Sequence, residues 1–183
     1  MATEVTGHPG LAARIADALA GNERDAHVHV ADLGAFDERP LAETDEAAWA
    51  ARAEEPIWTA FRCFQKAYAE GARAIVAVVP SIALTGASGL AAEAAAAEGI
   101  RQLVKSAARA WGREGVRVNC VTLPVEEWGI VPPPERQVPN RYGPSLPGAN
   151  DAEGIATAIT ALIDATAVTG ATVGVDRGTV LAP

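Results

Sequence analysis

Few side chains in this sequence stand at spacings that support acid–base, metal or nucleophilic chemistry. His27 and His29 alternate along a short run with β-branched residues, so both imidazoles would lie on one strand face, as two metal ligands can. No cysteine or third histidine stands nearby, and we therefore expect a structural pair. Glu93 and Glu98 form a possible carboxylate pair for acid–base catalysis, although we favour the simpler interpretation in which both face water on a helix. No Ser-His-Asp set or phosphate-binding P-loop is visible.

A glycine-containing turn, Gly-His-Pro-Gly-Leu-Ala, runs from Gly7 to Ala12. Such turns bring backbone N–H groups against a phosphate at the N-terminus of a helix. Pro9 removes one of these donors from the turn. A lone glycine-rich turn is a weak signal, so it does not by itself predict a nucleotide site.

The elements that would carry these residues alternate between strand and helix. Strands are predicted at 2–6, 27–30, 74–79, 116–123 and 172–175, and helices at 11–20, 44–70, 89–112 and 151–164. The run at 74–79 is continuously apolar, which is typical of a strand covered on both faces. The alternation predicts an α/β fold in which a mostly parallel sheet lies between helices, within one domain spanning 1–183.

The predicted helix at 44–70 has a start signal and an interruption. Thr44 or Asp45 can cap its N-terminus. Pro56 lies inside it and should kink or split the helix, because proline cannot donate the backbone hydrogen bond.

A long proline-rich loop is predicted at 124–148, with Trp128 and Tyr142 within it. Its apolar residues, which include Val125 and Val131, suggest that something covers them. We favour contact with a partner protein over a solvated loop, and a substrate pocket is a further possibility.

Composition limits the classes of function. The chain has 183 residues, 49% of them hydrophobic, and a formal net charge of −8, which suits a globular domain and argues against a nucleic-acid footprint. No apolar run is long enough for a membrane-spanning helix. Two cysteines, Cys63 and Cys120, make no disulfide framework and are expected to be buried, inert thiols. Residues 1–10 show no signal-peptide pattern, so a cytoplasmic location is predicted.

Four stretches of sequence have a familiar pattern. They are the apolar run at 74–79, the segments 99–108 and 115–119, the Thr-Gly-Ala-Thr-Val-Gly-Val-Asp-Arg-Gly stretch at 169–178, and the turn from Thr6 to Ala12. Together they resemble the short-chain dehydrogenase/reductase family, with Arg177 in place of one glycine of its closing signature. The resemblance implies a Rossmann-like three-layer sandwich.

The resemblance also implies where the catalytic residues of the family would align. Its Asn, Ser, Tyr and Lys fall on Pro56, Pro80, Glu93 and Ala97, with Ser81 beside the Ser position. In the family the Tyr is the general acid/base, and the Lys lowers its pKa and holds the cofactor ribose. Glu93 is the only one of the four that can hold a proton, and without a nearby cation it would not replace the Tyr–Lys pair.

The cofactor site of the family is altered in the same way. Gly7 and Gly10 of the first turn remain, but the turn is one residue shorter and Ala12 replaces its last glycine. The strand at 27–30 resembles the one that ends in the Asn-Asn-Ala-Gly motif of the family. Only residues 21–24 precede it where relatives have a strand-helix-strand unit, so the fold is predicted to lack that unit. An alternative alignment makes 27–32 the second strand of the family, with Asp32 as the ribose ligand.

We therefore predict a catalytically inactive subunit that holds no cofactor and pairs with an active NAD(P)-dependent paralogue. The resemblance places the contact at the helices 47–70 and 89–111, or at the last helix and strand, 151–164 and 172–175. The alternatives are a lyase or isomerase with a rebuilt, cofactor-independent site around Glu93, a module that binds a small ligand, and a true NAD(P) oxidoreductase.

Overall fold

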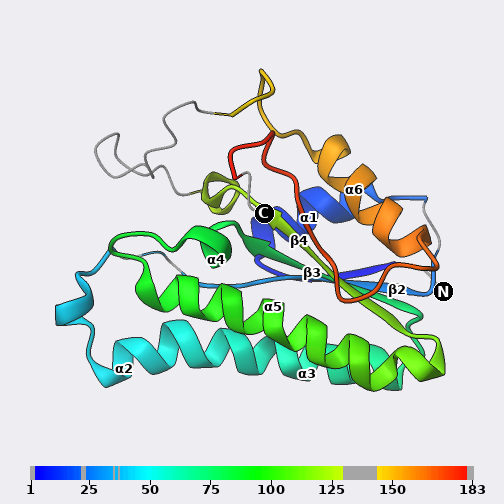
Figure 1. Cartoon of the computed structure of the whole chain (residues 1–183), viewed down its shortest axis with the longest axis horizontal. Coiled ribbons are helices and arrows are strands. Elements are labelled where there is room, and N and C mark those ends of the chain that lie inside the picture. The colour runs from blue at the N-terminus through cyan, green and yellow to red at the C-terminus, as the bar shows by residue number, and fades with distance from the viewer. Residues whose placement is uncertain (1–2, 22–23, 35, 37, 130–143, 181–183) are drawn as a thin grey trace.

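A parallel sheet of five strands in the order β1-β2-β3-β4-β5 forms the centre of the molecule, with helices on both faces (Figure 1). The computed structural model describes residues 3–21, 24–34, 36, 38–129 and 144–180. The strands are β1 (Glu4–Gly7), β2 (Ala26–Val30), β3 (Ala74–Pro80), β4 (Arg117–Leu123) and β5 (Thr172–Gly174). This arrangement confirms the predicted three-layer α/β sandwich.

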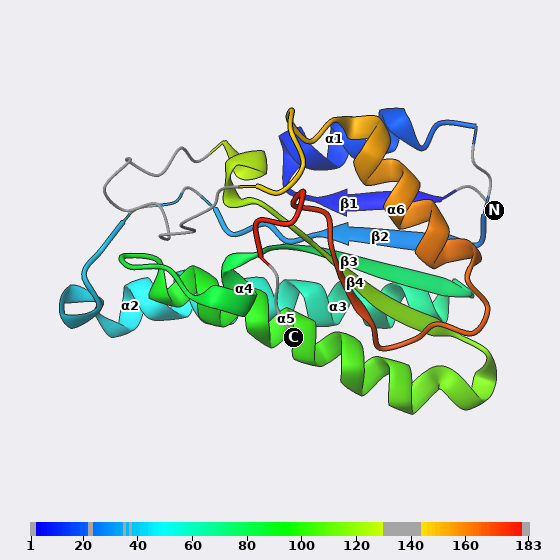
Figure 2. The same ribbon diagram turned by 45° about the horizontal axis from the view of Figure 1, so that its top comes forward.

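The helices divide into two layers (Figure 2). On one face lie α1 (Pro9–Ala18) and α6 (Ala152–Asp164), and on the other lie α3 (Glu55–Ala69) and α5 (Ala91–Trp111). Shorter helical pieces are η1 (Leu41–Glu43), α2 (Glu46–Trp49), η2 (Ala50–Glu54), α4 (Ile82–Thr85), η3 (Gly112–Glu114) and η4 (Val125–Trp128). Among the residues that the structure describes, no helix is both long and apolar enough to cross a membrane.

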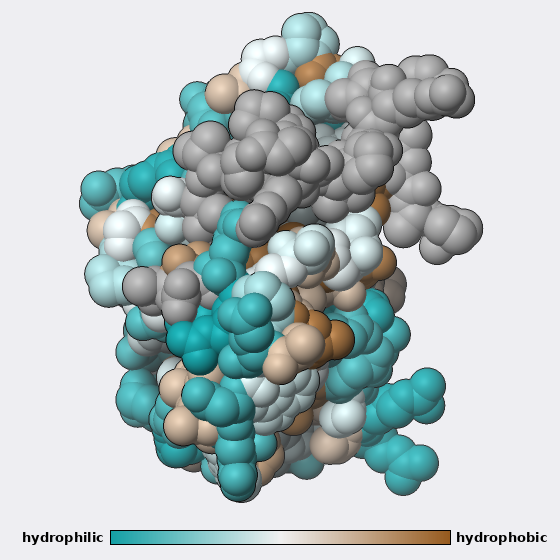
Figure 3. Space-filling model, turned by 90° about the vertical axis from the view of Figure 1, so that its left-hand side faces the viewer, coloured by the Kyte–Doolittle hydropathy of each residue, from teal (hydrophilic) through white to brown (hydrophobic). Residues whose placement is uncertain are grey.

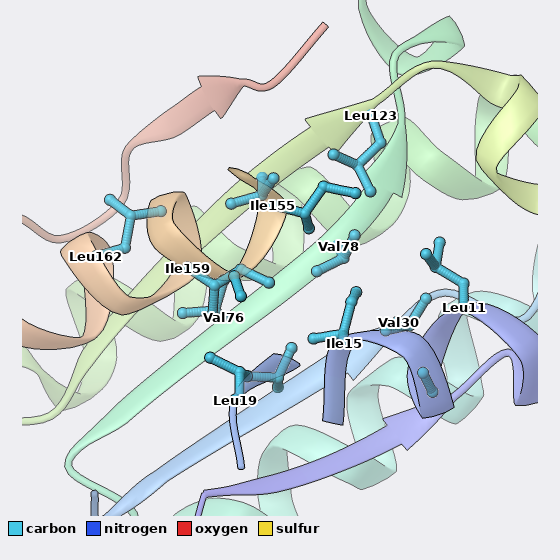
Figure 4. Packing of buried hydrophobic residues seen from close by; sticks show 14 of the residues in the cluster. Leu11, Ile15, Leu19, Val30, Val76, Val78, Leu123, Ile155, Ile159 and Leu162 are labelled. Atoms are coloured by element: carbon cyan, nitrogen blue, oxygen red, sulfur yellow. The ribbon is translucent and has the colours of Figure 1, made fainter. Parts of the chain in front are cut away.

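Alternation along the central strands builds a separate core on each face. Val76 and Val78 of β3 face α1 and α6, whereas Ile75 and Val79 face α3 and α5. All four are buried, as the continuous apolar run predicts. In the first core, leucines and isoleucines of α1 and α6 meet over β3 (Figure 4): Leu11, Ile15 and Leu19 from α1, and Ile155, Ile159 and Leu162 from α6.

The predicted helix at 44–70 is capped and divided as expected. The Asp45 carboxylate accepts a hydrogen bond from the Ala48 amide at 2.8 Å, so Asp45 rather than Thr44 is the cap. The π-helical turn η2 ends two residues before Pro56. Because Pro56 has no N–H for the carbonyl of Arg52, the regular hydrogen-bond ladder cannot run through this point.

The sheet order decides between the two alignments of the strand at 27–30. β2 pairs with β1 on one side and with β3 on the other, Val28 lying opposite both Val5 and Val76. In a dinucleotide-binding sheet the second strand lies on the far side of the first, away from the following strands. The alternative, in which 27–32 is that second strand and Asp32 the ribose ligand, is therefore wrong.

The connections between the strands have two different hands. Every connection moves in the same direction across the sheet, but α1 and α6 pack on one face and α3 and α5 on the other. Connections through opposite faces must then have opposite hands, although parallel connections are right-handed in about 98% of cases. The direct step from α1 to β2 agrees with the predicted lack of a strand-helix-strand unit, since no element lies between them in the described residues.

Candidate functional site

The first turn passes very close to the end of β2. Gly7 has a φ of +109°, and a Cβ at this position would lie 1.7 Å from the carbonyl oxygen of Val30. The next amide, of His8, donates to the same oxygen at 3.1 Å. Gly7 is thus required by the backbone itself, whatever the turn binds.

The N-terminus of α1 has few donors to offer a ligand. Pro9 has no N–H, and the His8 imidazole Nδ1 accepts from the Leu11 amide at 3.4 Å. The Ala12 amide donates to the His8 carbonyl at 2.8 Å. Gly10 remains as the turn's N–H donor, whereas a helix N-terminus that binds phosphate presents several.

A cavity of about 490 Å³ opens beside this turn, at the carboxyl ends of the strands. It is lined by residues of the turn, of the segment after β2, and of η4 and its end: His8, Pro9, Asp32, Gly34, Phe36, Glu38, Trp128 and Gly129. We call it the carboxyl-edge cavity. Figure 3 shows the molecule from the side on which α2 and α4 lie in Figure 1, where hydrophilic side chains surround smaller hydrophobic patches.

Two loops are joined beside this cavity. The Trp128 indole Nε1 donates to the Ala31 carbonyl at 2.8 Å, which fixes η4 over the end of β2. The Asp32 carboxylate accepts from the Gly34 amide at 3.1 Å. Trp128 and Val125 are buried in this chain's own core, so the expectation that a partner covers them is wrong. Tyr142 and Val131 of the proline-rich loop lie outside the described residues.

Glu93, at the Tyr position, is buried and paired. Its side chain is 2% exposed, and its Oε1 lies 3.4 Å from Nη1 of Arg52 on η2. Of the two possibilities left open for Glu93, exposure to water is therefore wrong, and a cation, the Arg52 guanidinium, does lie nearby. The π-turn changes the helix register just before Pro56, and this shift is hard to read from sequence.

Glu98 has different partners and does not share a site with Glu93. Its carboxylate accepts from Arg101 at 2.6 and 2.7 Å and from Gln102 at 2.7 Å, all within α5. Hydrogen bonding to Arg101 lowers the pKa of Glu98 against a smaller opposing effect of burial. The two carboxylates therefore form separate ion pairs rather than an acid–base pair.

The other aligned positions carry no chemistry. Pro80 ends β3 opposite Leu123, and the neighbouring Ser81 amide donates to the Leu123 carbonyl at 2.7 Å. Ala97 is fully buried in α5, and Pro56 is buried at the start of α3.

Apolar side chains pack together beside these positions. A small core joins the residues that follow β3, precede α5 and follow β4, namely Ile82, Leu90 and Val125, with Phe36, Ala87 and Ala94 against it. Glu93 is not among the described residues that line the carboxyl-edge cavity. The rebuilt active site around Glu93 thus gains no support from a described cavity.

Comparison with protein families identifies the family of this chain. A family model described as enoyl-(acyl carrier protein) reductase matches residues 8–180. The chain belongs to the short-chain dehydrogenase/reductase family. A comparison with curated proteins found no match to this chain.

Solved structures of dehydrogenases have a similar fold. A 4-hydroxyisoleucine dehydrogenase complexed with NADH has a TM-score of 0.68 at 17% identity, over 85% of this chain and 70% of that one. A citronellol catabolism dehydrogenase (AtuB) from Pseudomonas aeruginosa PAO1 has a TM-score of 0.66 at 21% identity, over 94% and 69% of the two chains. Identities this low show the fold alone, and they confirm the predicted Rossmann-like architecture.

The described residues lack most of the features by which dinucleotide-binding folds hold their cofactor. Those folds place the pyrophosphate at the N-terminus of the first helix and the ribose beside an acid at the end of the second strand. Here Gly10 is the donor that remains at α1, and β1 is the edge of the described sheet. Asp32 lines the carboxyl-edge cavity, and its exposed carboxylate would repel phosphate.

The two strand histidines are tied to the polar side chains of β1. Thr6 Oγ1 lies 3.1 Å from Nε2 of His27 and 3.5 Å from Nδ1 of His29, and Nδ1 of His27 lies 3.3 Å from Glu4. Burial, helped by neighbouring His27, lowers the pKa of His29 to about 4, and burial also lowers the pKa of His27. No group of three or more metal-ligating side chains occurs within the described part of the chain.

Neither cysteine is activated. Cys120 is buried in β4, and burial raises the pKa of its thiol to about 12. Cys63 on α3 is half-buried, and burial raises its pKa as well. A raised pKa keeps a thiol protonated and a poor nucleophile, in line with the expectation of inert cysteines.

Proposed function

We propose that this chain is a catalytically inactive short-chain dehydrogenase/reductase that acts as a subunit beside an active, NAD(P)-dependent member of the family. One observation carries the proposal: the Tyr position holds a buried Glu93 paired with Arg52, and the Lys position holds Ala97. A buried ion pair of this kind is costly to break and so is a poor proton relay. In this proposal NAD(P) is bound by the partner.

The face through which the partner binds is proposed to be the outer surface of α2 and α3. Trp58 is 55% exposed and Phe61 36%, and their rings meet edge to face with centroids 5.6 Å apart. Trp49, on α2, is also 36% exposed. Large exposed aromatic side chains are typical of the central residues of protein interfaces. The other predicted contact, α6 and β5, has one exposed large apolar residue, Val173.

Co-purification from the natural source, followed by reconstitution with the dehydrogenase that is recovered, tests this function. We expect one complex in analytical ultracentrifugation, which Trp58→Ala with Phe61→Ala weakens at least tenfold. The matched control is Leu41→Ala, since Leu41 is exposed but lies on η1, outside this face.

Activity measurements separate a subunit from an enzyme. Turnover by the complex should be unchanged in Glu93→Gln, because the proposed active site lies in the other subunit. A monomer that binds no family member, or turnover by the isolated chain that Glu93→Gln abolishes, would refute the proposal and favour the cofactor-independent enzyme.

A further inference from the structure

We propose that the buried pair His27 and His29 makes the attachment of strand β1 sensitive to acid, so that β1 separates from β2 when both imidazoles are protonated. Both side chains lie on the face of β2 that α3 covers, and they are 2% and 1% exposed. β1 is the edge of the described sheet and is paired there with β2 (Figure 2). This inference does not depend on pairing with a dehydrogenase.

One hydroxyl group on β1 contacts both rings. Thr6 Oγ1 lies 3.1 Å from Nε2 of His27 and 3.5 Å from Nδ1 of His29. The other ring nitrogen of His27, Nδ1, lies 3.3 Å from Oε2 of Glu4, which is also on β1. A hydroxyl donates one hydrogen bond and an ionised carboxylate only accepts, so these contacts determine where the protons lie.

Counting donors and acceptors assigns the tautomers of the two neutral rings. Because the Glu4 carboxylate only accepts, Nδ1 of His27 carries the hydrogen and its Nε2 accepts. The Thr6 hydroxyl therefore donates to His27, and its oxygen accepts from the Nδ1–H of His29. The donors thus run in one direction, from His29 through Thr6 and His27 to Glu4.

This chain of hydrogen bonds cannot persist when both rings are charged. His27 protonated at Nε2 becomes a second donor to Thr6 Oγ1, and the hydroxyl hydrogen loses its acceptor. The Cys63 thiol on α3 also hydrogen-bonds with Thr6, but sulfur is a weak acceptor. The two imidazolium groups would in addition repel each other, since they lie two residues apart on one strand face.

The surrounding charges do not offset two buried imidazolium groups. The charged side chains that act on the pair are Glu4 of β1, Lys66 and Glu70 of α3, and Asp32 after β2. Both glutamates already pair with the Lys66 ammonium, at 3.3 and 2.7 Å. β3 and α5 contribute apolar side chains to the core on this face. Burial lowers the pKa of both imidazoles, in agreement with this balance.

β1 is the element that yields to the added charge. It has four residues, whereas β2 is held on its other side by the longer strand β3. Separation of β1 removes Thr6 from the rings and lets water reach both imidazolium groups. Opening an edge strand costs less free energy than global unfolding. The opening exposes the backbone edge of β2, which can then pair with another strand.

Hydrogen exchange at individual amides, followed by NMR, tests the proposal. The His8 amide, which donates to the Val30 carbonyl, should exchange at least about tenfold faster at about pH 4.5 than at about pH 7, after correction for the intrinsic rate. The Ser81 amide, which donates to the Leu123 carbonyl, should change less than about twofold, because β3 and β4 stay paired. Nitrogen NMR at neutral pH should find both His27 and His29 as Nδ1–H tautomers.

Variants of the three histidines separate the pair from a single buried ring. His27→Gln and His29→Gln should each abolish the acid-dependent opening, because the remaining ring is charged without a second imidazolium beside it. The glutamine amide can also take over a hydrogen bond to Thr6. The matched control is His8→Asn, which removes the third histidine and keeps a side chain that caps α1, and it should open as the wild type does.

Each result supports or overturns the inference. Acid-dependent opening that persists in either glutamine variant would overturn it, and so would an Nε2–H tautomer of His27 at neutral pH. Equal acceleration at the His8 and Ser81 amides would show global opening and would also overturn it. If a glutamine variant does not fold, the tautomers and amide exchange of the wild-type protein still decide. None of these results bears on subunit pairing, which the ultracentrifugation experiment tests separately.

Discussion

The two glycines of the first turn should respond in opposite ways to the same substitution. Gly7→Ala places a Cβ at 1.7 Å from the Val30 carbonyl oxygen, in a backbone with a φ of +109°. Gly10→Ala places a Cβ whose nearest neighbour, Cε1 of His8, is 3.9 Å away. Each variant adds one methyl group to the same turn, so each is a control for the other.

The cost at Gly7 has two parts. A non-glycine residue in this backbone region costs about 1–3 kcal/mol. Relieving the overlap moves β1 away from β2 and breaks the 3.1 Å bond from His8 to Val30, which adds about 1–2 kcal/mol. The sum, roughly 3–5 kcal/mol, is a large share of the stability of a typical domain. Gly10→Ala should instead stabilise α1 by about 0.5 kcal/mol, since alanine loses less backbone entropy.

Urea unfolding followed by tryptophan fluorescence measures both values, and an unchanged m-value shows that the shifts are in stability. If Gly7→Ala is too unstable to be soluble while Gly10→Ala is soluble and slightly stabilised, the expectation is also met. The reasoning fails if Gly7→Ala loses less than about 1 kcal/mol, or if both variants lose the same amount.

Three further predictions concern the core. Burial lowers the pKa of His29 to about 4, against 6.5 for the unfolded chain. Between these two pH values the unfolded chain binds more protons than the folded one. The contribution of His29 to the free energy of unfolding should therefore fall by about 2 kcal/mol from pH 7 to pH 4.5. His29→Gln should reduce the difference in the free energy of unfolding between the two pH values, as measured by urea titration. An unchanged difference would contradict the argument that burial lowers the pKa of His29. Glu93→Ala should cost about 2–3 kcal/mol because it removes a buried carboxylate that is paired with Arg52, whereas Glu98→Ala, in a partly exposed pair, should cost below about 1 kcal/mol. Similar costs would contradict the burial of the first pair. Gly99→Ala should lower the melting temperature, because its Cβ would lie 2.6 Å from Cδ1 of Ile57, and Ile57→Val in the same protein should restore part of the loss.

The strongly patterned elements could be predicted from the sequence. The continuous apolar run predicted β3, and Thr44 or Asp45 marked the start of the next helix, because burial on both faces and an unsatisfied helix end each require particular residue types. The structure shows that Asp45 is the cap. Arg177 stands in place of a glycine of the family's closing signature and has a left-handed φ of 57°, a conformation that glycine adopts more readily than other residues.

The surroundings of Glu93 could not be predicted in this way. Around it the helix reads Ala-Ala-Glu-Ala-Ala-Ala-Ala-Glu, and alanine suits a buried and an exposed face equally, so no periodicity shows which way Glu93 points. Its partner Arg52 lies on a π-turn, which shifts the helical register. The carboxyl-edge cavity was likewise missed, because Phe36 and Trp128 come together only through the folded loops.

The placement of α1 and α6 on one face also sets an order of events during synthesis. Leu11 and Ile15 of α1 share a core with Ile155 and Ile159 of α6, and strands β2, β3 and β4 lie between the two helices in the sequence. The ribosome must therefore release the chain through α6 before this layer can close, while α3 and α5 already have their strands available. Until α6 emerges, a nascent chain would carry α1 with an uncovered apolar stripe, which makes that stripe a natural point of contact for chaperones.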